Sequence, residues 1–409
     1  MGSYSTKAPR KEWPDFAFLG RMLGGEAPEV VPTFVHPNGE QGEVHVKPLG
    51  PDAKWLGLWD TSTSPNGSGA ATRFTRKLWR GGLDSDLLSG WENIAGFPAA
   101  RATVAEQVAD TECQDHHDTP CYIWHPLRRK HLIYNTYAPG NLATVQPTAT
   151  GIRCFTIGVT ELDRLLEPPN SYRGGRDPSF KGVVHNRIGG TISWAQEFVI
   201  SSGEPTVFTG GFTEPSVVWL PHKQILRMFV TGITGVTDGA FTWNIGYLDS
   251  EDGITWFNPT LVWNPDDTSS PANEVFTTIT PGFRGAWQQE VFYDPVAKGI
   301  HMLACISNQN SLGKIGYYWS PDDGNTWFSH PLNPVLKLEA SGVGLGPTNP
   351  GGEDFGHIAT PTGFLDYKNR RMVVIVSGST NARGAGSDWF YAASAPLPYL
   401  REYSGSLVA

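Results

Sequence analysis

Residues 213–232 read TEPSVVWLPHKQILRMFVTG, two apolar runs separated by a short polar break. The runs at 217–220 and 225–230 each have the length of a β-strand and contain β-branched and aromatic residues. Between them, Pro221, His222 and Lys223 combine a proline with polar residues that suit a turn. The pattern predicts an antiparallel β-hairpin.

The same outline recurs along the chain. Clear copies occupy residues 117–137, 213–232, 288–306 and 357–378, and a weaker copy occupies 44–60. In each copy, a turn that contains proline or aspartate separates two apolar runs. Successive copies start roughly 70 to 95 residues apart, which leaves room for four strands with long loops. We therefore expect an all-β fold, a five-bladed β-propeller with four-stranded antiparallel blades around a central channel.

The repeat assigns residues 41–409 to the propeller, with units that start near 44, 118, 213, 288 and 357. Residues 1–40 form an N-terminal segment before the first unit. A strand from this segment could close the ring by joining the last blade, and a short helix over residues 13–23 is the alternative. The longest stretch without the repeat, 141–203, is expected to be an elaborated loop.

Two other stretches share a turn signature. Residues 250–256 read SEDGITW and residues 320–327 read SPDDGNTW, each shortly after an Ile-Gly-Tyr run. Ser and Asp side chains can satisfy backbone groups of the loop, Gly can take a positive φ, and Trp can pack between blades. The second stretch resembles the Asp-box of sialidases and related propellers, S-x-D-x-G-x-T-W, and the first is one residue shorter. We interpret both as structural turns between outer strands.

Composition and charge exclude several classes of protein. The 409 residues include 47 Gly and 32 Pro, too many for a helical protein, and 15 Trp and 20 Phe supply apolar mass for a core. Charged residues make up 17% and the formal net charge is -9, with only short basic clusters, so nucleic acid is not an expected partner. The chain has no run of about 18 apolar residues, and membrane insertion is not expected.

The cysteines and the N-terminus leave the cellular location open. Cys121 and Cys305 lie in apolar strand-like runs, where buried free thiols are common, whereas Cys113 and Cys154 could form a disulfide. Residues 1–12 lack the apolar centre of a signal peptide. An extracellular or virion-surface location is favoured, and an oligomer or a larger assembly is compatible with it.

Polar residues gather where the first strand of each unit begins. In a propeller these strand starts surround the central channel, so side chains from different units converge at one end. Glycoside hydrolysis needs two carboxyl groups in different environments, and histidines and aromatic rings can assist sugar binding. The candidates are Asp118 and Glu214 as catalytic carboxylates, with His116, His117, Thr213, Trp287, Gln288, Glu290 and His357 as substrate-binding residues.

The order of these strand starts resembles the five-bladed furanosidase propellers of glycoside hydrolase family 43 and its relatives. The matching motifs are an Asp in the second unit, Thr-Glu-Pro in the third and Gly-His in the fifth. The resemblance implies that Glu214 is the general acid, that Asp118 modulates it, and that His357 lies at the central channel. A structural calcium ion could sit beside His357, bound through water, and no other cofactor is expected. The implied activity is hydrolysis of a polysaccharide or oligosaccharide, with furanose-containing substrates included.

Two features keep a second interpretation open. The first unit has no clear Asp-Pro strand start for the general base of that family, so Asp118 could itself be the base. Glu214 precedes Pro215 and could accept backbone hydrogen bonds at a strand start instead of acting as an acid. A non-catalytic propeller that binds glycan or protein, for example in a phage tail or cell-surface attachment protein, fits the sequence as well.

Overall fold

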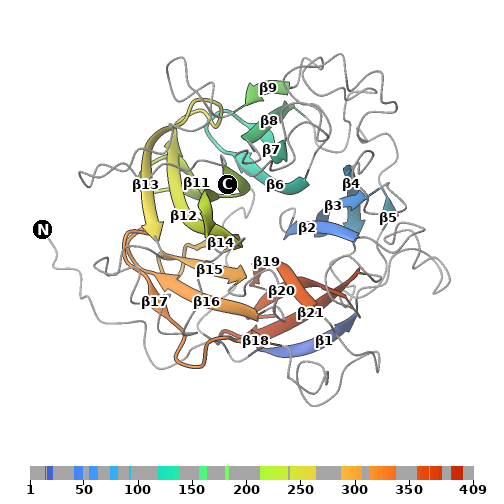
Figure 1. Ribbon diagram of the computed structural model, residues 1–409. Coiled ribbons are helices and arrows are strands. Elements are labelled where there is room, and N and C mark those ends of the chain that lie inside the picture. Colours follow the sequence, from blue (N-terminus) through green and yellow to red (C-terminus); the bar gives the residue numbers. More distant parts are fainter. Residues whose placement is uncertain are drawn as a thin grey trace, which may run out of the picture.

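The computed structural model is all-β in the part of the chain that it describes, as the sequence predicts (Figure 1). The described residues are 14, 16–21, 41–48, 55–62, 74–81, 92–93, 118–137, 156–163, 180–183, 212–237, 240–263, 287–305, 314–337, 357–367, 369–379 and 388–398. Their strands all pair antiparallel with their neighbours. Within these ranges there is no helix long and apolar enough to cross a membrane.

The strands of the described ranges form five sheets, and most strands that follow one another within a sheet are neighbours in it. The first sheet contains β2 (Gln41–Pro48), β3 (Trp55–Ser62), β4 (Phe74–Gly81) and β5 (Glu92–Asn93). The second contains β6 (Asp118–His125), β7 (Lys130–Tyr137), β8 (Thr156–Leu162) and β9 (Phe180–Val183). The third contains β10 (Phe212–Leu220), β11 (Ile225–Thr237), β12 (Ala240–Ser250) and β13 (Phe257–Trp263).

The remaining two sheets complete the set. The fourth contains β14 (Trp287–Asp294), β15 (Gly299–Cys305), β16 (Lys314–Ser320), β17 (Phe328–Ser329) and β18 (Leu336–Lys337). The fifth contains β19 (His357–Asp366), β20 (Arg371–Ser379), β21 (Asp388–Pro396) and β1 (Ala17–Arg21). Where the sequence left a short helix open, β1 is a strand, and it pairs with β21 at the edge of this sheet.

The first strands of the five sheets contact one another in a closed circuit. Strand β2 contacts β6, β6 contacts β10, β10 contacts β14, β14 contacts β19, and β19 contacts β2. In Figure 1 the labelled β2, β6, β14 and β19 lie toward the centre, and later strands of each sheet lie further out. We call these five the inner strands. Segments far apart in the sequence therefore begin close to one another.

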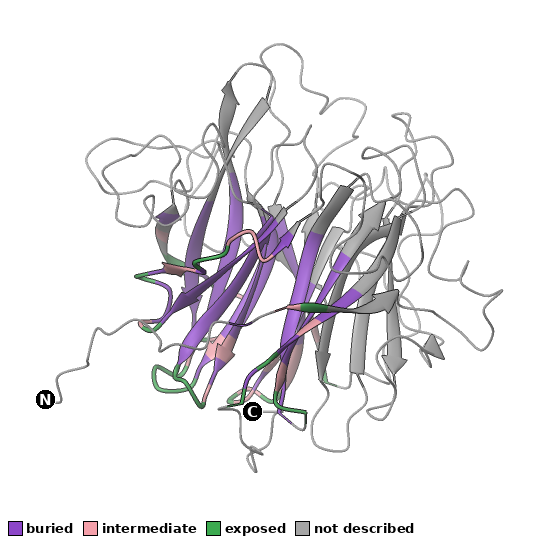
Figure 2. Cartoon of the chain, turned by 90° about the horizontal axis from the view of Figure 1, so that it is seen from below, coloured by how far each residue is buried: buried purple, intermediate pink, exposed green. Residues whose placement is uncertain are grey.

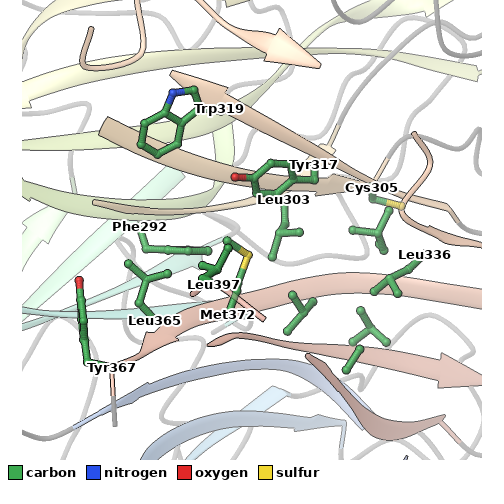
Figure 3. Close-up of a cluster of buried hydrophobic side chains, with 14 residues drawn as sticks. Phe292, Leu303, Cys305, Tyr317, Trp319, Leu336, Leu365, Tyr367, Met372 and Leu397 are labelled. Carbon is green, nitrogen blue, oxygen red and sulfur yellow. The ribbon is translucent and has the colours of Figure 1, made fainter. Parts of the chain in front are cut away.

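The hydrophobic core lies between neighbouring sheets. Val217 and Val218 are consecutive in β10, yet Val217 packs in a cluster with the second sheet and Val218 in one with the fourth. A third cluster joins the fourth and fifth sheets, where Phe292 lies near Leu365 and Met372 (Figure 3). A strand buried on both faces needs an uninterrupted apolar run, and Figure 2 shows in purple that long stretches of the strands are buried.

The hairpins between the first and second strands of four sheets close in the same way. Strand pairing ends at His125↔Lys130, Leu220↔Ile225, Asp294↔Gly299 and Asp366↔Arg371, which leaves four residues in each loop. The last loop residue has a positive φ in each case: 55° at Arg129, 56° at Gln224, 56° at Lys298 and 50° at Arg370. The turns that the sequence predicted at these four places are confirmed.

The stretch 320–327 forms a turn held by its own side chains. The backbone N–H of Gly324 donates to Ser320 Oγ at 2.7 Å, and that of Thr326 donates to Asp322 Oδ1 at 2.7 Å. Gly324 has a φ of 93°, where a side chain would be strained, and an added Cβ would lie 2.6 Å from Phe229. The ring of Trp327 packs edge-on against Phe229 of the third sheet, with centroids 5.8 Å apart.

The shorter stretch 250–256 repeats this arrangement. Gly253 N–H donates to Ser250 Oγ at 2.7 Å, and Thr255 N–H donates to Asp252 Oδ1 at 2.6 Å. Burial raises the pKa of Asp252, but the hydrogen bonds from Thr255, Ile254 and Ser250 outweigh it and lower the pKa. Trp256 packs edge-on against Tyr134 of the second sheet. Both turns thus attach one sheet to the preceding one, which supports the structural interpretation.

The stretch 141–203, expected to be a loop, contains two strands. Strands β8 and β9 extend the second sheet outward from β7. The expectation was wrong for β8 because Ile157 and Val159 alternate with small or polar residues and are both buried in the core. Of the cysteines, Cys121 and Cys305 are buried and belong to no disulfide, in line with the prediction. Cys113 and Cys154 lie outside the described residues.

Candidate functional site

Each inner strand carries an irregularity a few residues after its start. The pairing register shifts between Gln41 and Val44, Asp118 and Cys121, Thr213 and Ser216, Trp287 and Glu290, and Ala359 and Thr362. In each strand, two residues lie inside the shift. A bulge of this kind bends the strand and redirects a side chain, and bulges are common beside active sites. The bulges lie at equivalent places in the five sheets.

Three bulge residues have left-handed backbone conformations. The φ angle is 58° at Glu214, 51° at Gln288 and 48° at Thr360, and each is the first residue inside its bulge. This region is costly for residues other than glycine, about 1–3 kcal/mol each, and persists only where surrounding contacts hold it. The contacts that hold these three residues therefore define the candidate site.

Glu214 is bound directly to the neighbouring sheet. Its side chain is nearly buried, with 8% of the residue exposed, and Oε2 accepts a hydrogen bond from the backbone N–H of Gln288 at 2.6 Å. The sequence left open that Glu214 accepts a backbone hydrogen bond at a strand start, and this contact is of that kind. A fixed N–H donor holds a carboxylate in one orientation, which is also what a positioned catalytic carboxyl group needs.

The next bulge repeats the contact. Gln288 Oε1 accepts a hydrogen bond from the backbone N–H of Thr360 at 3.1 Å. The side chain of one bulge residue therefore accepts the N–H of the equivalent residue in the following sheet, from Glu214 to Gln288 and from Gln288 to Thr360. The repeated contact links the inner strands β10, β14 and β19 at the same level of the ring.

Behind this chain of contacts lies a buried pair, Gln289 and Thr231. Gln289 Nε2 donates to the backbone carbonyl of Glu214 at 2.6 Å. Thr231 Oγ1 donates to Gln289 Oε1 at 2.5 Å and accepts the N–H of Gln288 at 3.2 Å. Both the carboxylate and the carbonyl of Glu214 are therefore bound to the two bulge residues of β14.

Glu290 lies just beyond the bulge of β14. It is buried, and its Oε2 accepts a hydrogen bond from Ser216 Oγ at 2.9 Å. Ser216 Oγ in turn accepts the N–H of Val291 at 2.8 Å, so this group ties β10 to β14. The substrate-binding role of Glu290 stays a prediction. The hydrogen bond from Ser216 to Glu290 joins the inner strands β10 and β14.

The structure places the other predicted residues only by their backbone positions or not at all. Asp118 pairs with Thr136 as Thr213 pairs with Thr231, so Asp118 corresponds in register to Thr213 and stands one residue before the bulge. Trp287 takes the same place in β14, and His357 begins β19 three residues before Thr360. The side chains of Asp118, Thr213, Trp287 and His357, and all of His116 and His117, lie outside what the structure describes.

The sequence carries no signal for Thr231, which lies on a second strand, whereas Gln289 and Thr360 lie among the polar residues at the strand starts without an assigned role. A signal for the bulge exists: Pro120, Pro215 and Pro361 each take its second position. Proline lacks an N–H and is tolerated in a strand at a bulge, where no ladder bond is needed. When the strands are aligned on this proline, Thr119, Glu214 and Thr360 occupy the same position. Asp118 lies one position earlier in the alignment than Glu214.

The described side chains include no group of three or more His, Cys, Asp or Glu residues that could hold a metal ion. The calcium ion expected beside His357 therefore stays a prediction. Two tryptophans of the inner strands were further candidates for stacking on a sugar ring. Trp219 packs against the core and against His125, with ring centroids 5.6 Å apart. Trp124 lies against His131 at 4.6 Å. These contacts favour a packing role for both rings.

No protein-family model and no curated protein matches the chain. Solved structures do resemble it. A thermostable family-43 glycoside hydrolase aligns with a TM-score of 0.53 and 12% identity over 88% of this chain and 91% of that chain. An α-L-arabinofuranosidase from Lactobacillus brevis aligns with a TM-score of 0.54 and 9% identity over 88% and 93%.

An enzyme of another activity is similar to the same extent. An N-acetylgalactosamine deacetylase from F. plautii, in complex with blood group B trisaccharide, aligns with a TM-score of 0.53 and 13% identity over 94% of each chain. At such identities the similarity shows the fold, which is that of β-propeller hydrolases. Because one fold carries different reactions, the function has to be argued from the residues of the site.

Proposed function

We propose that the protein is a glycoside hydrolase that acts on a polysaccharide or oligosaccharide, furanose-containing substrates included. In this proposal the five sheets are the blades of a five-bladed propeller, and the substrate binds where the inner strands begin. The observation that carries the proposal is Glu214: a nearly buried carboxylate in a left-handed bulge, held by the Gln288 N–H of the next sheet. The fold that the chain shares with two glycoside hydrolases supports it.

The proposed roles follow from what hydrolysis of a glycosidic bond requires. Glu214 in its protonated form gives its proton to the glycosidic oxygen, which leaves with the electrons of the broken bond. Asp118, on the adjacent inner strand, is the partner carboxylate. It either removes a proton from the attacking water or bonds to the anomeric carbon itself as the leaving group departs. In the second route, water that gives a proton to Glu214 then displaces Asp118 and releases the sugar. A separation of about 5–5.5 Å between the carboxyl groups corresponds to the second route, and about 6.5–9.5 Å to the first.

The remaining predicted residues complete the proposed substrate site. They are the substrate-binding residues His116, His117, Thr213, Trp287, Gln288, Glu290 and His357, with a calcium ion beside His357 as a structural element. Gln288 binds Glu214, and Glu290 binds Ser216 two residues further along the same strand. Both residues therefore lie close to where the proposal places the sugar.

The variant Glu214→Gln tests the acid. An amide oxygen can still accept the N–H of Gln288, so the bulge keeps its contact while the proton donor is lost. Sugar release from the polysaccharides that the wild type degrades should fall by about 10² to 10⁴-fold. The measurement is reducing-sugar release across a panel of plant and microbial polysaccharides, with circular dichroism and thermal melting to check the fold.

Asp366→Asn is the matched control. Asp366 is a buried carboxylate at the last residue of β19, where it accepts a hydrogen bond from Arg371 at 2.9 Å, at the other end of that strand from the bulge. This variant should lose stability and keep activity. Full sugar release by Glu214→Gln would refute the assignment of the acid. If the wild type bound a glycan without releasing sugar, the protein would be a non-catalytic binding propeller.

A further inference from the structure

Thr231 and Gln289 make a set of contacts that hold Glu214 from behind. Gln289 is 4% exposed and Thr231 is fully buried. Thr231 lies on β11, the second strand of the third sheet, and Gln289 lies on the inner strand of the fourth. Their hydrogen bond therefore crosses from one sheet to the next at the level of the Glu214 bulge.

The donors and acceptors in this set have only one consistent arrangement. The carbonyl of Glu214 can only accept, so the Gln289 side chain must present its Nε2 there. Gln289 Oε1 then needs a donor, which is the hydroxyl of Thr231. The N–H of Gln288 can only donate, and it is shared between Thr231 Oγ1 at 3.2 Å and Glu214 Oε2 at 2.6 Å. One hydroxyl therefore orients both the amide that binds the Glu214 backbone and the N–H that binds its carboxylate.

We infer that Thr231 and Gln289 are positioning residues for Glu214, and this inference rests on the proposed function of Glu214 as the acid. The left-handed backbone conformation of Glu214 directs its carboxylate toward the Gln288 N–H. The Gln289 amide holds that backbone in place through its hydrogen bond to the Glu214 carbonyl oxygen. Neither residue transfers a proton. Their effect is to keep the carboxyl group in one orientation, on which a proton transfer to the glycosidic oxygen depends steeply.

The matched pair Thr231→Val and Thr231→Ser tests the inference. Valine has nearly the shape of threonine and lacks the hydroxyl, whereas serine keeps the hydroxyl and lacks the methyl group. Thr231→Val should lower kcat by on the order of 10²-fold with little change in KM, because a displaced catalytic group slows the reaction more than it weakens binding. Thr231→Ser should retain most of the wild-type kcat.

A second measurement does not depend on activity. In protein labelled with ¹³C at the glutamate carboxyl carbons, the signal of Glu214 is the one that disappears in Glu214→Gln. This signal should move in Thr231→Val and stay at its wild-type position in Thr231→Ser. If Thr231→Val does not fold, Gln289→Met removes the Thr231–Gln289 hydrogen bond together with the bond to the Glu214 carbonyl, and should also move the signal and lower kcat.

The outcomes separate the two proposals. A folded Thr231→Val variant with an unmoved Glu214 signal overturns the positioning role, and so does one with unchanged kcat. If the wild type releases no sugar from any substrate, the proposed function fails. The carboxyl signal of the Thr231 pair then decides alone whether these residues position Glu214.

Discussion

At the scale of single residues, His131 is a partly buried base in the second sheet. Its Nδ1 lies 3.0 Å from the hydroxyl of Tyr122, and its ring lies against Trp124. Burial disfavours the charged ring and lowers the pKa of His131 to about 4, while the negative charge of Asp163 raises it slightly. Burial also raises the pKa of Tyr122, so its hydroxyl stays protonated beside the neutral imidazole, to which it is hydrogen-bonded.

His131 should therefore make the stability of the protein depend on pH. In the unfolded chain the histidine titrates near 6.5, and in the folded chain near 4. Between these values the unfolded chain binds the extra proton, so the stabilisation present above pH 6.5 is lost as the pH falls toward 4. In His131→Gln this contribution is absent. Urea unfolding at pH 7, 5.5 and 4 should show that the free energy of unfolding of the wild type, relative to the variant, decreases as the pH falls. A difference that stays constant would contradict the assignment.

At the scale of elements, the hairpins and the Ser-Asp turns follow from the sequence because their chemistry is local. Ser320, Asp322 and Gly324 lie within five residues and satisfy one another's backbone groups. A contact between strands gives no such signal. Arg227 interrupts the apolar run of β11, and its partner Asp249 is 22 residues further along the chain. Only the pairing of β11 with β12 brings the two residues opposite each other.

Arg227 and Asp249 form a buried ion pair. Removal of one partner should lower the free energy of unfolding more than replacement of both by apolar residues. Two hydrogen bonds of 2.7 and 2.8 Å join them, and Arg227 also donates to the carbonyl of Asp323 at 2.6 Å. The guanidinium group lies 3.7 Å above the ring of Tyr247. Removing one partner strands a buried charge, so Arg227→Met should lower the free energy of unfolding by about 3–5 kcal/mol.

The double variant Arg227→Met/Asp249→Leu leaves no isolated charge at this place and should recover most of that loss. Chemical unfolding of the two single variants and the double variant gives the coupling between the residues. Arg371→Met is the comparison and should cost less, since the side chain of Arg371, which pairs with Asp366, is 24% exposed against 4% for Arg227. Additive losses in the double variant would show that the pair contributes no coupling.

At the scale of the whole molecule, the sequence predicted the repeat, because each unit carries its own hairpin. It left open that Glu214 accepts a backbone hydrogen bond but did not predict the donor, because that N–H belongs to the next sheet along the chain. Glu214 can accept the Gln288 N–H only because the fold brings the bulge of β14 beside that of β10. The carboxylate itself was found from its place at a strand start, and Gln289 stands at such a place too, but Thr231 lies on the second strand of its sheet and could not be found in this way.

The pairing of the two ends of the chain leads to a prediction for the whole molecule. Strand β1 pairs with β21, so residues near the start of the chain form the outer strand of the sheet that contains its last strands. Phe16, just before β1, packs against the hydrophobic cluster between the fourth and fifth sheets, and its ring centroid lies 6.2 Å from that of Tyr317. Removal of residues 1–21 would take away this strand and the Phe16 contact together.

Deletion of residues 1–21 should lower the thermal midpoint and promote aggregation, since β21 would then present an unpaired edge. A deletion of residues 1–12, which keeps β1, is the control. A synthetic peptide of residues 13–23 should raise the midpoint of the shorter protein in proportion to the logarithm of its concentration once binding saturates, because it binds only the folded state. If the deleted protein melts like the control, β1 adds nothing to stability. If it melts lower and the peptide restores it, the edge of β21 is where the beginning of the chain stabilises the last sheet.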